Sequence, residues 1–276
     1  MAKINLPSKP RPALSSTPKR MILFSKPKVG KTFTVSKLPD CLILDFEEGT
    51  LAIDAMSYPI KSIKDVAEVC KAIKEAEYPY KYIAVDTASA LEEMCLPVAE
   101  MQWAKSPEGA KWFLADEHGK LHESSGKAKY GTIMNLPYGK GYSLVSDVFN
   151  DVIKRLEKCT PKLIILAHST YATLNKDGTD FTPLDIQMSK KCKFAATFKA
   201  DAIGYIYRKG SQNFVNFTPT EDVGAGGRHR YLEKKHILLS EWIVEENSEE
   251  EFHTYWDSIF APSKNEAEKK TTKSKQ

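Results

Sequence analysis

The sequence predicts an α/β protein built on a mainly parallel β-sheet with helices on both faces. Several short segments are continuously apolar, which is typical of strands that are buried on both faces of a sheet. These segments alternate with stretches in which apolar residues recur at helical spacing, and this alternation is the order that produces a parallel sheet. The apolar segments are residues 21–24, 41–44, 82–85 and 163–167.

Three segments are predicted to be helices. Residues 31–37 follow the first apolar segment, and Pro39 ends this helix because proline cannot continue the backbone hydrogen-bond pattern. Residues 62–76 begin at Ser62, a favourable N-cap residue, and place apolar side chains on one face. Residues 142–158 have apolar side chains at 144, 145, 148, 149, 152, 153 and 156, the spacing of an amphipathic helix.

The C-terminal part of the chain predicts β-hairpin elements instead of alternating strands and helices. Residues 202–207 and 214–217 are expected to pair around the turn at 209–211, and residues 237–239 add another short strand. Residues 246–261 are predicted to close the fold as an amphipathic helix. Its apolar side chains are Phe252, Tyr255, Trp256, Ile259 and Phe260.

Charge separates the two ends of the chain from its middle. Residues 1–20 contain five Lys or Arg and no acid, and residues 261–276 contain five Lys and two Glu. The net charge of the whole chain is +4, so residues 21–260 carry a net charge of −4. Basic ends of this kind either contact nucleic-acid phosphates or keep the chain soluble.

The same composition predicts how the chain is divided. We expect a disordered basic arm at residues 1–19 and a disordered Lys-rich tail at residues 262–276, because neither has apolar periodicity. Residues 20–245 are expected to form one domain, and residues 97–137, which lack clear periodicity, are expected to be an insertion in it.

Composition also narrows the class of protein. The chain has 276 residues, of which 42% are hydrophobic and 28% charged, as in ordinary globular proteins. No apolar run approaches the roughly 18 residues that span a bilayer, and the Pro-rich N-terminus has no apolar secretory segment. We therefore expect a cytoplasmic protein without a membrane partner. Five widely spaced cysteines argue against a disulfide framework and a structural zinc site.

The strongest functional signal is a phosphate-binding loop at residues 25–32. It ends in Gly30-Lys31-Thr32, the essential end of the pattern GxxxxGK[ST], and it lies between an apolar segment and a predicted helix. Glycine lets the backbone curl closely around phosphates, and Lys31 reaches the β- and γ-phosphates of a nucleoside triphosphate. Ser25 replaces the first glycine of the pattern. The predicted phosphate-binding residues are Ser25, Lys26, Pro27, Lys28, Val29, Gly30, Lys31, Thr32 and Phe33.

Two residues are predicted to hold Mg²⁺. The Thr32 hydroxyl is one metal ligand of the phosphate-loop pattern. Asp86 ends the third apolar segment, which places its carboxylate at the ligand-binding edge of a parallel sheet, where it would hold Mg²⁺ directly or through water. The alternative for Asp86 is an N-cap of the helix that follows.

Further polar residues follow the second and fourth apolar segments. Glu47 is the first candidate for the general base that orients the attacking water, and Glu48 is the second. His168 is a candidate sensor of the γ-phosphate. The alternatives are a solvated acidic loop at 45–48 and a structural histidine.

Together these motifs resemble the phage RecA-like P-loop ATPases, the AAA-domain nucleotide-binding proteins of bacteriophages. The resemblance covers residues 20–245, and in RecA-like proteins an Asp-x-Glu after the second strand supplies the catalytic carboxylate, which matches Asp45-Phe46-Glu47. The resemblance implies a RecA-like core, Mg²⁺-dependent ATP hydrolysis in the host cytoplasm, and a role in DNA recombination and single-strand annealing. The matching motifs are residues 28–32, 45–49, 83–87, 138–142, 166–168 and 226–228.

Arg228 lies in a Gly-rich segment, residues 224–230, that is expected to be mobile. Three roles are open for its guanidinium. It could reach the γ-phosphate of a neighbouring copy as an arginine finger in a homo-oligomer, grip a DNA phosphate, or do neither.

The leading hypothesis is an ATPase that acts on single-stranded DNA, alone or with phage single-strand DNA-binding or replication proteins. ATP is favoured over GTP because residues 175–178 lack the final Asp of a guanine-reading motif. The alternatives are a small-molecule kinase, such as a nucleoside or nucleotide kinase, and a non-catalytic nucleotide-gated accessory module. The expected DNA contacts, besides the basic ends, are Trp103, Lys105, Lys111, Trp112, Lys127 and Lys129.

Overall fold

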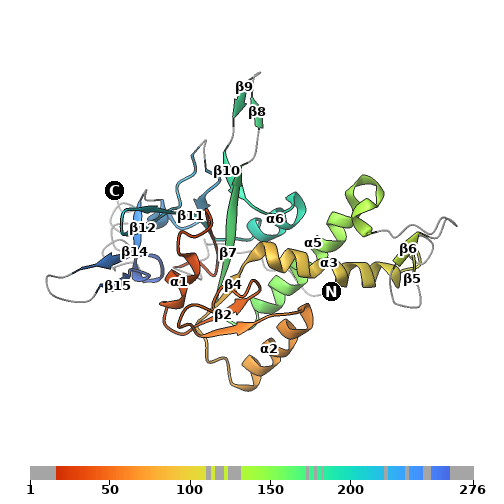
Figure 1. The fold of residues 1–276 in the computed structure, drawn as a ribbon, viewed down its shortest axis with the longest axis horizontal. Helices are drawn as coiled ribbons and strands as arrows, with labels where there is room; N and C mark the ends of the chain where they lie inside the picture. The colour runs from red at the N-terminus through yellow and green to blue at the C-terminus, as the bar shows by residue number, and fades with distance from the viewer. Residues whose placement is uncertain are drawn as a thin grey trace, which may run out of the picture.

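The computed structural model contains one large mixed sheet of eleven strands, with helices on both faces (Figure 1). Its main path runs in the order β15-β14-β12-β11-β1-β7-β4-β2-β3, and β10 and β13 pair with β7 and β11 off this path. The structure describes residues 17–109, 113–115, 121–123, 132–171, 174–176, 179–181, 183–220, 223–233, 236–244 and 250–261.

Six neighbouring strands of this sheet are parallel, which confirms the predicted α/β class. The four apolar segments of the sequence form four of these strands, and their side chains are buried on both faces. β1 lies between β7 and β11, and β7 separates β1 from β4. The six strands are β1 (Arg20–Ser25), β2 (Cys41–Asp45), β3 (Ser57–Pro59), β4 (Tyr82–Asp86), β7 (Lys162–Tyr171) and β11 (Ala202–Lys209).

Beyond β11 the sheet continues as three antiparallel strands, which we call the antiparallel wing: β12 (Gln212–Asn216), β14 (Ile237–Ile243) and β15 (Glu251–Thr254). The predicted hairpin of β11 and β12 is confirmed. The predicted C-terminal helix at 246–261 is corrected within its described residues, 250–261, where 251–254 form a strand and only α7 (Asp257–Phe260) is helical. Residues 246–249 of the prediction lie outside the described residues. Exposed and partly buried side chains alternate along residues 251–254, and this period suits a strand paired with the edge of β14.

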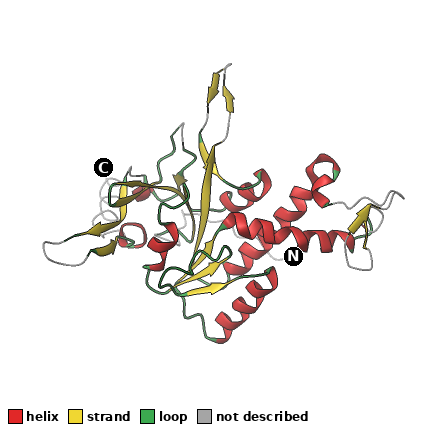
Figure 2. Ribbon diagram, viewed as in Figure 1, coloured by secondary structure: helices red, strands yellow, loops and turns green. Residues whose placement is uncertain are grey.

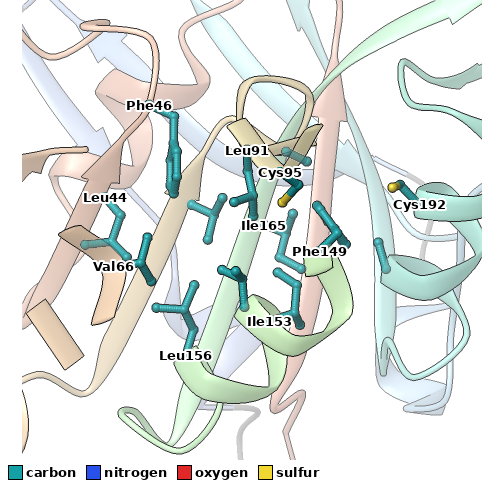
Figure 3. Close-up of a cluster of buried hydrophobic side chains, with 14 of the residues drawn as sticks. Leu44, Phe46, Val66, Leu91, Cys95, Phe149, Ile153, Leu156, Ile165 and Cys192 are labelled. Carbon is teal, nitrogen blue, oxygen red and sulfur yellow. The ribbon is translucent and has the colours of Figure 1, made fainter. Parts of the chain in front are cut away.

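The helices cover the two faces of the sheet unequally (Figure 2). One face packs against four helices, and its core includes the α5 residues Phe149, Ile153 and Leu156 (Figure 3). The opposite face packs against α1 and α7. The predicted capping of α2 is confirmed, because Ser62 and Asp65 form a reciprocal capping box. The bounds are α1 (Lys31–Ser36), α2 (Ile63–Glu75), α3 (Ala88–Ala104), α5 (Lys140–Leu156) and α6 (Lys190–Thr197).

The predicted insertion at residues 97–137 is corrected at its start. Helix α3 continues through Pro97 to Ala104. Leu91, Cys95, Ala99 and Trp103 recur every fourth residue and are all buried in the core, so tertiary packing maintains the helix through the proline. Further on, the described part of the segment contains β5 (Phe113–Ala115), β6 (Leu121–Glu123), η1 (Ile133–Asn135) and η2 (Pro137–Gly139).

Short elements complete the described chain. Two short strands, β8 and β9, pair with each other in an antiparallel arrangement. All five cysteines are buried and unpaired. Within the described residues, no helix has the length and apolar character needed to span a membrane. The remaining bounds are β8 (Leu174–Lys176), β9 (Thr179–Phe181), β10 (Leu184–Ile186), β13 (Gly226–Gly227) and η3 (Arg230–Leu232).

Candidate active site

The phosphate-loop sequence lies where the pattern requires, between the end of β1 at Ser25 and the start of α1 at Lys31. Gly30 has φ +97°, a backbone conformation that favours glycine, and it leads the chain into α1. Lys26, Pro27 and Lys28 are exposed in the loop. The strand–loop–helix geometry therefore presents the loop backbone at the carboxyl edge of the parallel strands, where α/β proteins bind ligands.

Lys31 is buried, and its ammonium group is held at this edge. Its Nζ donates to Ser25 Oγ at 3.1 Å and lies 3.3 Å from His168 Nδ1. Burial lowers the pKa of Lys31, while the negative charges of Asp86 and Glu47 act to raise it. Ser25, which replaces the first glycine of the motif, thus has a positive role here: its hydroxyl accepts a hydrogen bond from the loop lysine.

Thr32 and Asp86 lie side by side, as expected for two ligands of one cation. The Thr32 hydroxyl donates to Asp86 Oδ2 at 2.6 Å, and Asp86 is only 3% exposed. Burial raises the pKa of Asp86 and the charges of Glu47 and Asp45 raise it further, whereas the Thr32 hydrogen bond and Lys31 lower it. A hydroxyl and a carboxylate are the hard oxygen donors that suit Mg²⁺. A cation would also relieve the crowding of negative charge.

Glu47 is held over the same edge by two neighbours. Its Oε1 accepts a hydrogen bond from the Thr87 hydroxyl, and its Oε2 lies 3.4 Å from His168 Nε2. Its side chain is 36% exposed, so water can reach the carboxylate. His168 therefore bridges Lys31 and Glu47 through its two ring nitrogens. Thr87 was not among the predicted residues, although its place directly after Asp86 at the strand end was a usable signal.

Asp45 organises the loop that carries Glu47. It is 2% exposed and accepts hydrogen bonds from the backbone of Glu47, Gly49 and Thr50 and from the Thr50 hydroxyl. Burial acts to raise its pKa, but these hydrogen bonds outweigh burial and hold the pKa below its usual value. The acidic segment after β2 is therefore a structured loop in which Asp45 fixes the backbone of Glu47.

Two predicted catalytic residues are not part of this cluster. Glu48 is exposed, with φ 58°, and its carboxylate forms no hydrogen bond or ion pair with the described residues. Arg228 pairs with Asp201 at 3.2 Å, just after β13, which lies along the amino end of β11. The phosphate loop lies at the opposite, carboxyl end of β1, so Arg228 does not reach the site of its own chain.

These features define a P-loop nucleoside triphosphatase: a Gly-Lys-Thr loop after β1, an acid at the end of β4, and His168 on β7, the strand between them. The model of the AAA domain family matches residues 17–229, and the chain belongs to this family. The family gives a nucleotide-binding P-loop ATPase domain, and the mainly parallel sheet with helices on both faces gives its α/β fold class.

Comparison with solved structures finds a KaiC-like protein, PH0186, from the hyperthermophilic archaeon Pyrococcus horikoshii OT3. The two share 9% sequence identity over 87% of this chain and 89% of that chain, with a TM-score of 0.39. No curated protein matches the sequence.

Proposed function

We propose that this protein is a Mg²⁺-dependent ATPase that acts on single-stranded DNA during phage DNA recombination or replication. The observation that carries the ATPase proposal is the Glu47 carboxylate, which Thr87 and His168 hold at the same sheet edge as Lys31. A fixed carboxylate that water can reach, beside a phosphate-loop lysine, is the arrangement that hydrolysis of a phosphoanhydride requires.

In this proposal each residue has a defined task. The loop backbone and Lys31 bind the phosphates, and Thr32 and Asp86 hold Mg²⁺, which neutralises phosphate charge when bound. Glu47 orients a water molecule and accepts its proton. His168 contacts both Lys31 and Glu47, so a change at the γ-phosphate that moves Lys31 would also move the ring that holds Glu47.

Steady-state hydrolysis tests the whole proposal. Purified protein should release phosphate from ATP, faster with single-stranded DNA, and Lys31→Ala should abolish release. If DNA did not change the turnover, the proposed action on single-stranded DNA would be rejected, and the proposed ATP hydrolysis would stand. Absence of turnover, together with intact ATP binding, would favour the non-catalytic gated module.

The DNA part of the proposal needs contacts other than Trp103. That side chain is 6% exposed and Lys140 covers its ring at 4.1 Å, so no DNA base can stack on it. Lys105 is exposed at the end of α3 and remains a candidate phosphate contact. The candidates Lys111, Trp112, Lys127 and Lys129 lie outside the described residues, as do most of the basic residues of the two ends. Of those that are described, Lys19 is exposed, whereas Arg20 is buried and pairs with Glu157.

Assembly is a further part of the proposal. Arg228 could serve the ATP of a neighbouring copy only in a homo-oligomer, after leaving Asp201. Mixing Arg228→Ala with Glu47→Gln tests this role, because each defective copy would then supply what the other lacks and turnover would partly return.

A cavity of about 480 Å³ keeps a small-molecule kinase as the second candidate. Ser89 lines this cavity and lies 3.4 Å from the Thr87 hydroxyl that holds Glu47, so a bound acceptor would sit near the γ-phosphate. Glu92 and Glu93 also line it and would repel a phosphorylated acceptor. A kinase would release ADP only when a neutral or cationic acceptor is added.

A further inference from the structure

An aromatic cluster lies beside the phosphate loop on the side of β1 that carries none of the groups assigned to the γ-phosphate. Phe33 directly follows Thr32, and its ring lies nearly parallel to that of Trp242 in β14, with centroids 5.6 Å apart and an interplanar angle of 14°. Phe252 of β15 contacts both rings, at 4.6 Å and 4.9 Å between centroids. All three side chains are partly exposed. We call these three residues the wing aromatic cluster.

Hydrogen bonds hold the wing against α1. Ser240 Oγ of β14 lies 3.2 Å from Thr34 Oγ1, and Asn213 Nδ2 of β12 donates to Ser240 Oγ at 3.1 Å. Trp256 Nε1 donates to the Thr34 carbonyl at 3.2 Å. The cluster is therefore fixed relative to the phosphate loop before any nucleotide binds, which lowers the entropy cost of binding.

The sheet order sets the direction of a bound nucleoside triphosphate. Lys31, Glu47, His168 and Asp86 place the γ-phosphate toward β7 and β4, on one side of β1. A triphosphate on the loop is extended, so its nucleoside leaves toward the other side, where β11 and the wing lie (Figure 1). Phe33 immediately follows the loop, and its ring contacts Trp242 and Phe252 of the wing.

We propose that the wing aromatic cluster is the base-binding site, with the nucleobase stacked on Trp242. This inference rests on the proposed ATP binding and names the part of the site that would recognise the base. Val244, two residues beyond Trp242 in the chain, is 70% exposed and extends the apolar surface. Stacking on an apolar aromatic surface accepts any base, so selectivity between ATP and GTP is small, and purines bind more tightly than pyrimidines because their rings overlap more.

Calorimetry with two ligands separates base binding from phosphate binding. We would titrate the full chain with β,γ-imido-ATP and with inorganic tripolyphosphate, both with Mg²⁺. Trp242→Ala should weaken binding of the nucleotide roughly 5- to 100-fold, the range for loss of one base–aromatic stack, and leave tripolyphosphate binding unchanged. Trp242→Phe should restore most of the affinity. Phe194→Ala, which also replaces an aromatic ring with a methyl group, at an exposed position on α6, is the control and should change neither.

The outcomes that overturn the inference are distinct from failure of the proposed function. Equal loss of affinity for both ligands would mean that Trp242 only supports the loop. Unchanged nucleotide affinity in Trp242→Ala would place the base elsewhere. If the wild-type chain bound neither ligand, the proposed ATP binding itself would fail. Nucleotide should also quench tryptophan fluorescence in the wild type and not in Trp242→Phe, a readout that a structural role would not give.

Discussion

The two sides of β1 are built differently and carry different groups. On one side lie the parallel strands β7, β4 and β2. β7 carries His168 beside the last residue of β1, and β4 and β2 end in Asp86 and Asp45. On the other side, beyond β11, lies the antiparallel wing, which offers Trp242 and Phe252. Polar groups that suit phosphate chemistry lie on the first side, and apolar surface lies on the second.

Strand direction explains the difference. Parallel strands bring all their carboxyl ends to one edge, so short polar segments after several strands meet there. Antiparallel strands alternate in direction, so a turn brings only one pair of ends together, and the faces of the strands carry the useful side chains. Motifs at strand ends therefore predict the polar residues of the phosphate site, but they do not predict the aromatic residues of the antiparallel wing.

The largest expected effect tests whether Glu47, on the β7 and β4 side of β1, is the general base for ATP hydrolysis. Glu47→Gln should lower the turnover number for ATP by roughly 10²- to 10⁴-fold, because the amide cannot accept a proton, and should leave ATP affinity nearly unchanged. Steady-state hydrolysis at saturating ATP measures the turnover number, and calorimetry measures the affinity.

Glu48→Gln is the matched control, since Glu48 is the adjacent acid but is exposed and has no contact with the described cluster. It should hydrolyse ATP like the wild type. If Glu48→Gln were the inactive variant and Glu47→Gln active, the base would be Glu48, and the Thr87–Glu47–His168 contacts would have another purpose.

The second effect tests whether the loop after β2 depends on Asp45. Asp45→Asn should lower the free energy of unfolding at pH 7 by about 2–4 kcal/mol, because a buried carboxylate that accepts several hydrogen bonds is replaced by an amide that must place a donor there. Asp151→Asn, at an exposed acid of α5, should cost under about 0.5 kcal/mol.

The pH dependence of this loss has a defined sign. The pKa of Asp45 is lower in the folded chain than in the unfolded chain, where it is about 3.9. Its contribution is therefore complete above about pH 4 and disappears as the pH falls through the folded pKa. Urea denaturation of both proteins should give curves that converge at acid pH. A difference that stayed constant with pH would show that the charge of Asp45 does not matter.

Most of the residues on the β7, β4 and β2 side of β1 could be predicted from the sequence, because the sequence motifs there coincide with the ends of predicted strands. Lys31, Thr32, Asp86, Glu47 and His168 were all expected near the phosphates, and the structure brings them together. Neither Thr87 nor the organising role of Asp45 was expected, because a hydrogen-bond partner depends on tertiary geometry and not on a motif.

The wing and α3 show where local patterns fail. Residues 251–254 were predicted to be helical, but they form a strand because they pair with the edge of β14. A lack of clear periodicity over residues 97–137 suggested an insertion, yet packing of Leu91, Cys95 and Trp103 continues helix α3 to Ala104. In both cases a tertiary contact overrides a weak local preference.

The smallest expected effect is a gain in stability at the metal site. The pKa of Asp86 is higher in the folded chain than in the unfolded chain, first because the carboxylate is buried. Stability is therefore lost as the pH rises from the unfolded pKa through the folded pKa, and remains reduced above it. Asp86→Asn removes the buried charge and keeps an acceptor for Thr32, so at pH 7 without nucleotide it should raise the free energy of unfolding by about 0.5–2 kcal/mol.

Mg²⁺ and ATP should reverse the stability difference between the wild type and Asp86→Asn. With Mg²⁺ and ATP the wild type gains binding free energy that the variant lacks, so it should become the more stable protein in thermal melts. At pH 3.5 without ligand the two proteins should melt alike, since both side chains are then largely neutral. If Asp86→Asn were the less stable protein at pH 7 without ligand, the Thr32 hydrogen bond and the positive charge of Lys31 would outweigh the cost of burying the carboxylate. The β7 and β4 side of β1 would then need no cation to balance its charge.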